Sequence, residues 1–361
     1  MSRFIEVHIL QQLPPSCLNR DETGTPKTCM YGGVPRARVS SQAWKKAVRD
    51  MLRGQNPTAG VTHRTRDWRR EIGARSGLDM TVERNITLFD RLREIAGLDL
   101  NGSADLKAKG MLSALLALGD RQWDALGTIA RDAAASDDPD EYLNERKPDI
   151  RRIIRDDRAL DLALFGRMVA VKDTKTDYGV DAACQVAHAI GVGRTDVEYD
   201  YYSAVDENPD ADGAGMIGDI GFDAPLLYRY ALIEWDRLLN NLHDAMDATD
   251  ATIMFLNAFA LSLPSGRQNT FAARTQPLFV AVTVRDDRPA NLSAAYATPV
   301  PLDDGTEAVR RLDTEAQRVE TMFDMTPVFA AHVGGDAPHL GEPMESWPRL
   351  LDTLHDALEA L

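Results

Sequence analysis

Hydrophobic residues form four short runs that are typical of β-strands, at residues 4–10, 160–171, 226–235 and 277–284. A longer apolar stretch at residues 252–263 predicts a buried helix. Further helices are predicted around residues 307–323 and 346–361, and a short one at residues 182–190. Alternating short and long apolar runs of this kind indicate a mixed fold, in which helices cover a sheet.

The segment that follows the first predicted strand combines a loop broken by Gly and Pro with a helix of two contrasting faces. Its apolar side chains repeat at helical spacing, and Ser40 or Ser41 can cap its start. The apolar face consists of Ala43, Trp44, Ala47, Val48, Met51 and Leu52, and the cationic face of Lys45, Arg49 and Arg53, with Lys46 beside them. Donors oriented on a helix suit a polyanion backbone, although charge alone favours an ordinary solvated surface helix.

Residues 55–157 separate this helix from the second predicted strand and have mainly helical character, including the apolar runs 111–118 and 123–130. Residues 197–225 are rich in glycine and aspartate, which predicts a projecting hairpin or flexible arm with Tyr199, Tyr201 and Tyr202 near its base. Without the residues 55–157 and 197–225, the core elements of the chain follow the order strand, helix, strand, strand, helix, strand. That order predicts an α+β fold with the ferredoxin-like plan of RNA-recognition motifs.

Charge is distributed unevenly along the chain. Between residues 27 and 75, twelve Lys and Arg stand against three acids, a local net charge of +9, whereas the whole chain carries −15. Such an acidic protein is poorly suited to indiscriminate nucleic-acid binding. The basic segment therefore predicts one dedicated anion site, with a repulsive surface elsewhere.

Other features bear on location and chemistry. Cys17, Cys29 and Cys184 are too few and too scattered for a disulfide framework or a zinc cluster, which favours a reducing cytoplasm. The N-terminus is too short and polar for a signal peptide. The apolar stretch at residues 251–266 is interrupted by polar residues and proline, so no membrane span is predicted.

Six segments, in order along the chain, resemble a known family: SCLNRDETG (16–24), GGVPRARVSSQAWKKAVR (32–49), ALFGRMVAV (163–171), YYSAVDE (201–207), GDIGFDAPLLYRYALIEW (218–235) and LPSGRQNTFAAR (263–274). They resemble the CasC-type backbone subunit of the type I-E CRISPR Cascade complex. The first two segments are the most specific, and the resemblance covers roughly residues 1–285.

The resemblance implies a right-hand shape without enzymatic activity or cofactor. The palm would comprise residues 1–54, 159–196 and 226–361, with helical fingers at 55–158 and a glycine-rich thumb hairpin at 197–225. It further implies that several copies polymerise along one guide RNA and present its spacer to target DNA. The other implied partners are the large subunit CasA, the small subunit CasB, CasD and CasE.

A subunit that accepts any spacer should grip phosphate and sugar and leave base edges free. The residues expected to contact RNA are Asn19, Arg20, Lys27, Arg38, Ser40, Gln42, Lys45, Lys46, Arg49, Arg267 and Gln268. Gly32 and Gly33 would allow close approach of the backbone.

The resemblance adds three residues to this set. Arg167 and Met168 lie in the segment where the family places an apolar wedge against bases, although a Met within an apolar run is usually a core residue. Tyr202 aligns with a thumb aromatic residue and could stack on a base, or it could anchor the arm to the palm. Many acids in the arm, among them Asp206, Glu207 and Asp219, suit a basic neighbouring subunit instead of RNA.

Two alternatives remain open. Related backbone subunits of other CRISPR types cut RNA with an aspartate in the loop after the first strand, and Asp21 with Glu22 occupies a comparable loop. Metal-assisted cleavage usually needs several convergent carboxylates, so this pair is weak support. The other alternative is a small-molecule enzyme, but the histidines, including His8, His63, His188 and His332, lack metal-binding spacing.

Overall fold

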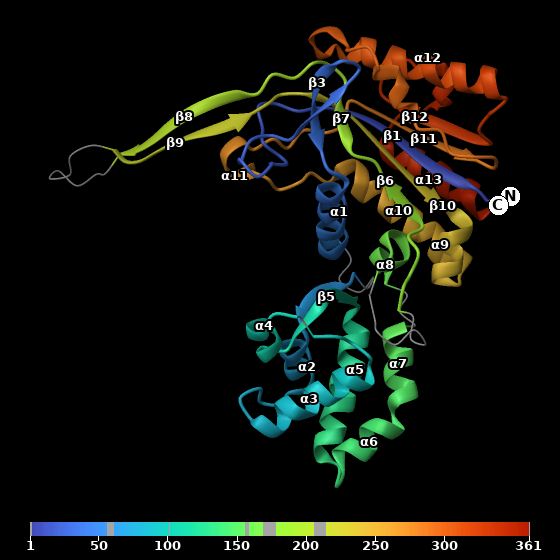
Figure 1. Cartoon of the computed structure of the whole chain (residues 1–361). Coiled ribbons are helices and arrows are strands. Elements are labelled where there is room, and N and C mark those ends of the chain that lie inside the picture. Colours follow the sequence, from blue (N-terminus) through green and yellow to red (C-terminus); the bar gives the residue numbers. More distant parts are fainter. Residues whose placement is uncertain are drawn as a thin grey trace. The chain divides into compact units, whose positions relative to one another are not determined.

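The computed structural model describes residues 2–55, 61–100, 102–155, 159–168, 178–205 and 214–360. The chain divides into two compact units (Figure 1). The first consists of Met1–Met51, Cys184–Leu239 and Asp244–Leu361, and the second of Leu52–Ala183 and Asn240–His243. No helix within the described ranges is both long and apolar enough to cross a lipid bilayer.

A large sheet forms the centre of the first unit. Its strands are β1 (Phe4–Gln12), β2 (Thr28–Tyr31), β3 (Val34–Val39), β6 (Cys184–Val186), β7 (Ala189–Gly191), β10 (Leu226–Glu234), β11 (Phe279–Arg285), β12 (Phe329–Val333) and β13 (Glu342–Pro343). They lie in the order β13-β12-β11-β1-β10-β7-β3-β2, and β6 also pairs with β10. All pairs are antiparallel except β12 with β13.

Helices cover both faces of this sheet. They are α1 (Ser41–Gln55), α9 (Trp235–Leu242), α10 (Ala245–Leu261), α11 (Gln268–Phe271), α12 (Gly305–Phe323) and α13 (Trp347–Glu359), with short 3-10 helices at Leu292–Tyr296, Pro301–Asp303 and Pro338–Leu340. Side chains of a strand alternate between faces. On β10, Tyr228 and Tyr230 therefore enter the core that α12 covers, whereas Arg229 faces Trp44 of α1 and Phe259 of α10.

A separate two-stranded ribbon extends from the first unit (Figure 1). β8 (Glu198–Val205) and β9 (Ala214–Phe222) pair in antiparallel register, and the residues between them, which include Asp206, Glu207, Asp210 and Asp212, lie outside the described ranges. Tyr199 and Tyr201 share one face of β8 and are both exposed. The hairpin predicted at residues 197–225 is therefore present.

The second unit is mainly helical. Its helices are α2 (Trp68–Ser76), α3 (Glu83–Ile95), α4 (Ala104–Ala108), α5 (Asp120–Ala135), α6 (Pro139–Glu145), α7 (Lys147–Arg155) and α8 (Leu160–Phe165), and its strands are β4 (His63–Asp67) and β5 (Met111–Leu118). The indole rings of Trp68 and Trp123 meet in its core, with their centroids 5.9 Å apart. Both side chains are fully buried.

Three element predictions are wrong. Residues 111–118, expected to be helical, form β5. The strand expected at residues 160–171 begins as α8, which ends at Phe165 and is followed by Gly166 with a φ of 72°; residues 169–171 lie outside the described ranges. The helix expected at residues 182–190 is replaced by β6 and β7. Short apolar runs carry little periodicity, and in each case pairing or packing with distant segments decided the structure.

Candidate nucleic-acid interface

The start of α1 is fixed by the loop that follows β1. Asn19 Oδ1 accepts a hydrogen bond from the backbone N–H of Ser40 (2.9 Å), and the carbonyl of Asn19 accepts one from Lys27 N (2.9 Å). Ser40 Oγ in turn accepts from Ala43 N (3.3 Å), as an N-cap does. Asn19 and Ser40 thus organise the helix start, and Gln42 in the first turn is exposed.

The cations predicted on α1 divide between two flanks of the helix. Lys45 and Arg49 lie near Cys184: burial raises the pKa of that thiol to about 12, and both charges act in the opposite direction. Lys45 is half-buried, and its pKa is lowered first by burial and then by Arg49. Lys46 is exposed on another side and forms an ion pair with Asp50, one turn later.

Two further cations, Arg38 and Lys27, lie near His188, which follows Cys184 by four residues. Arg38 Nη1 lies 3.1 Å from His188 Nδ1. The pKa of His188 is lowered by burial and then by the charges of Arg38 and Lys27, so these groups lie close together. Lys45 and Arg49 thus lie near Cys184, and Lys27 and Arg38 lie near His188, four residues later. We call these four cations, Lys27, Arg38, Lys45 and Arg49, the cationic strip.

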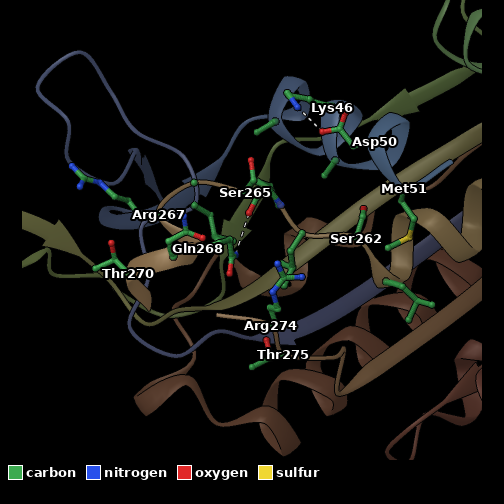
Figure 2. Close-up of a pocket in the computed structure, with 18 of the residues that line it drawn as sticks. Lys46, Asp50, Met51, Ser262, Ser265, Arg267, Gln268, Thr270, Arg274 and Thr275 are labelled. Atoms are coloured by element: carbon green, nitrogen blue, oxygen red, sulfur yellow. Dashed lines mark hydrogen bonds and ion pairs between the residues drawn. The ribbon is translucent and has the colours of Figure 1, made fainter. Parts of the chain in front are cut away.

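A groove of about 930 Å³ lies on the flank of α1 that carries Lys46. Its other wall is the segment from the end of α10 to Gln276, and we call it the α1 groove. Figure 2 shows Lys46 and Asp50 on the helix, with Ser265, Gln268 and Arg274 on the facing segment. This wall contains Arg267 and Gln268, so the structure brings these two predicted residues together with Lys46.

A glycine brings the groove wall against the loop after β1. A Cβ atom at Gly266 would lie only 2.3 Å from the carbonyl oxygen of Leu18, so no larger residue fits there. A second hollow of about 460 Å³ joins Gly266 to the loop residues Leu18, Asn19, Arg20, Asp21, Glu22 and Gly24. Arg20 is exposed at this hollow.

Arg274 is a candidate that sequence reasoning missed. It is exposed, it lines the α1 groove, and no ion pair involving it is found in the described part of the chain. The residue falls inside the sixth motif segment, at residues 263–274. Its position in this motif segment was the one indication that the sequence offered. No helical or strand periodicity in the segment predicted that its side chain would line the groove.

Arg167 differs from the expectation of an RNA contact. Its side chain is only 5% exposed and donates hydrogen bonds to the carbonyls of Tyr178 (2.8 Å), Ala117 (3.0 Å) and Ile154 (2.7 Å). The guanidinium therefore holds segments of the second unit together. Met168, the next residue, is 92% exposed, so it is a projecting side chain and not a core residue.

Tyr202 is half-buried on the hairpin ribbon. It pairs with Gly218 across the strands, and a Cβ atom at Gly218 would lie 2.7 Å from the Tyr202 hydroxyl. The ring thus covers the glycine, as aromatic residues do for glycines in exposed ribbons. This contact lies within the ribbon, so it does not itself anchor the arm to the palm. Tyr199 and Tyr201 are more exposed than Tyr202.

The loop carboxylate considered for catalysis has a structural role. Asp21 Oδ1 accepts from Thr23 N (2.9 Å), Thr23 Oγ1 (2.7 Å) and Thr25 N (3.2 Å), and Oδ2 accepts from Thr25 Oγ1 (3.0 Å). These bonds lower its pKa, the Thr23 side chain most of all. Within the described residues, the one group of His, Cys, Asp or Glu close enough to share a metal ion is His355, Asp356 and Glu359 on α13, away from this loop.

A family model described as CT1975-like protein matches residues 5–349. The chain belongs to this family. No curated protein is similar enough to count as a relative. The resemblance to CasC-type Cascade backbone subunits, drawn from the six motif segments, is confirmed.

Two solved structures are similar to the family member described here over nearly its whole length. One, titled "CRISPR RNA-guided surveillance complex, pre-nicking", shares 33% identity at a TM-score of 0.82 and covers 98% of this chain and 100% of its own. The other, titled "CRISPR RNA-guided surveillance complex", shares 28% identity at a TM-score of 0.64 and covers 98% and 99%.

Proposed function

We propose that this chain is a non-catalytic, guide-RNA-binding subunit that polymerises along the spacer of a CRISPR RNA in a Cascade surveillance complex. It would grip the RNA backbone and leave the bases free to pair with target DNA. The observation that carries this proposal is the cationic strip beside the α1 start, formed in a chain whose net charge is −15. The titles of the similar solved structures support it.

The strip has the chemistry of a backbone site. Lys27, Arg38, Lys45 and Arg49 present ammonium and guanidinium groups, which bind phosphates irrespective of base sequence. Gln42 and the first turn of α1 add a neutral amide and a helix N-terminus, both suited to phosphate oxygens. A protein that must accept any spacer needs this combination, because contacts to base edges would compete with target pairing.

The sheet order supports a palm of the ferredoxin-like type. In the strand order β11-β1-β10-β6 each strand is antiparallel to its neighbours, and α1 and α10 lie on one face of these strands. Numbered by their order in the core, these strands follow the 4-1-3-2 arrangement of that plan, with β6 in the place expected for residues 160–171. We assign the second unit as the fingers and the β8–β9 ribbon as the thumb.

Four side chains are proposed to pack on base faces without contacting the base edges. Met168 projects from a loop that Arg167 fixes, and a thioether packs on any base face. Tyr199, Tyr201 and Tyr202 on the ribbon offer aromatic faces for stacking. The other proposed partners are further copies of the chain and the CasA, CasB, CasD and CasE subunits.

Co-purification tests the proposal directly. The full chain, isolated from its host, should carry short RNAs of uniform length that share one repeat-derived end, and sequencing would identify them. The double variant Lys45→Ala/Arg49→Ala should recover much less RNA with the same sequence distribution. RNA of random length and origin, or none, would exclude the guide-binding role.

A further inference from the structure

The α1 groove differs in chemistry from the cationic strip. Most of its polar lining is neutral: Ser262, Ser265, Gln268, Asn269, Thr270 and Gln276 contribute hydroxyl and amide groups. Among its three lining cations, Lys46 is paired with Asp50, and Arg267 and Arg274 lie on the opposite wall. Neutral donors and acceptors are poor counterparts for phosphate charge, but they match sugar hydroxyls, which both donate and accept hydrogen bonds.

Polar atoms in the groove wall lack partners. Gln268 Nε2 donates to the carbonyl of Pro264 (3.2 Å), which fixes the orientation of the amide, and Oε1 has no hydrogen-bond partner among the residues that the structure describes. The same holds for Ser262 Oγ, on a side chain only 3% exposed. Buried polar atoms without partners are costly and are normally satisfied in the functional state.

An unpartnered acceptor requires a donor from the ligand. Phosphate oxygens only accept, so the RNA backbone offers one donor per nucleotide, the ribose 2′-hydroxyl, which DNA lacks. We infer that the α1 groove binds the 2′-hydroxyl of the guide through Gln268 Oε1, with Ser262 beside it, and thereby selects RNA over DNA. This inference rests on the proposed function and specifies the ligand of the same surface.

The two flanks of α1 fit one strand. A helix with its side chains is about 10 Å across, so the cationic strip and the α1 groove are within reach of one short segment of single strand that crosses the helix start. Phosphates on the strip would then place a neighbouring ribose in the groove. Arg267 and Arg274 at the groove would hold the next phosphates.

The experiment compares three single strands of one mixed sequence: RNA, 2′-fluoro RNA and DNA. Fluorine preserves the sugar pucker of RNA but cannot donate a hydrogen bond, so it isolates the donor. Wild-type full chain at fixed salt should bind RNA about two- to tenfold more tightly than 2′-fluoro RNA, the effect of one hydrogen bond. Gln268→Leu should lose affinity for RNA and leave that for 2′-fluoro RNA unchanged.

A matched control is Gln317→Leu, the same change at an exposed position of α12 on the other face of the sheet. It should preserve the preference for RNA. Melting curves of each variant report whether it folds. If Gln268→Leu does not fold, Ser262→Ala provides a second variant, which should reduce the difference in affinity between RNA and 2′-fluoro RNA.

The outcomes separate the inference from the proposed function. Equal loss of affinity for RNA and 2′-fluoro RNA in Gln268→Leu would mean that the residue only positions the loop, and would overturn the inference. Equal binding of both strands by wild type would also overturn it while leaving backbone binding intact. If wild type bound no single strand, the proposed function itself would fail.

Discussion

The replacement of Lys45 and Arg49 by alanine tests the cationic strip quantitatively. The two residues are one helical turn apart on the same flank of α1, so their side chains are about 5–6 Å apart at Cβ and can reach adjacent phosphates. Partial burial of Lys45 strengthens its electrostatic interactions relative to a fully solvated amine. Both substitutions remove a cation that the proposal assigns to RNA.

The expected magnitude follows from counterion release. Each phosphate contact to a single strand contributes about 0.7 to the slope of log affinity against log salt, so losing two contacts should reduce the slope by about 1.4. Between 50 mM and 200 mM salt, wild type should therefore lose roughly sevenfold more affinity than the double variant. The change should be the same for all spacer sequences, because phosphates carry no sequence information.

Fluorescence anisotropy with several labelled single strands, titrated over a series of salt concentrations, measures this slope. The matched control is Arg310→Ala/Arg318→Ala on α12, which removes the same two charges on the other face of the sheet. Its slope should equal that of wild type. An equal change of slope in both double variants would show that net charge and not contact is responsible, and a loss that depended on sequence would refute backbone binding.

Three further predictions concern other residues. Asp21→Ala should lower the melting temperature by loosening the Thr23–Thr25 turn, and labelled RNA should stay intact with magnesium or manganese before and after the change; cleavage by wild type that the variant lost would establish a nuclease. Met168→Ala should change the free energy of unfolding by less than about 0.5 kcal/mol but weaken the RNA complex, as chemical denaturation and anisotropy would report. For Asp223, burial raises the pKa from 3.8 to about 7, so the folded state binds more protons between these values and wild type should lose stability as pH rises through them. The loss in the free energy of unfolding is about 4 kcal/mol at most, and Asp223→Asn should abolish it. If urea unfolding gave a stability difference between wild type and Asp223→Asn that did not vary between pH 5 and pH 8, the prediction would be contradicted.

Elements with long or clear apolar patterns could be predicted from the sequence. The strands β1, β10 and β11 and the helices α1, α12 and α13 lie close to their predicted positions, because each buries a continuous set of side chains. The helix predicted at residues 252–263 is also present, but α10 begins seven residues earlier, at Ala245. By contrast, residues 182–190 are rich in alanine and locally favour a helix. They form β6 and β7 because β10 and β3 offer backbone groups to pair with, which no local pattern records.

The candidate site was predictable as a list of residues but not as an arrangement. Lys45 and Lys46 are neighbours in sequence, yet successive helical residues lie about 100° apart, so they belong to different flanks and different environments. Arg167 carries the charge expected of an RNA contact, but its guanidinium is buried because it donates to backbone carbonyls such as that of Ala117, 50 residues away. The α1 groove depends on a loop closure at Gly266 that only the packed structure reveals.

A buried arginine connects the sheet to both walls of the site. The guanidinium of Arg229 lies 3.8 Å from the ring centroid of Trp44 on α1 and 4.6 Å from that of Phe259 on α10, and donates to Gln11 Oε1 (2.6 Å). Burial lowers its pKa to about 9, so it remains charged at neutral pH despite the cost of desolvation. Apolar residues would fill the same volume without that cost, but they would not fix the two helices through directed contacts. The cations that the proposal assigns to RNA are thus visible in the sequence, whereas the packing of α1 and α10 against the sheet depends on a side chain that is buried in the core.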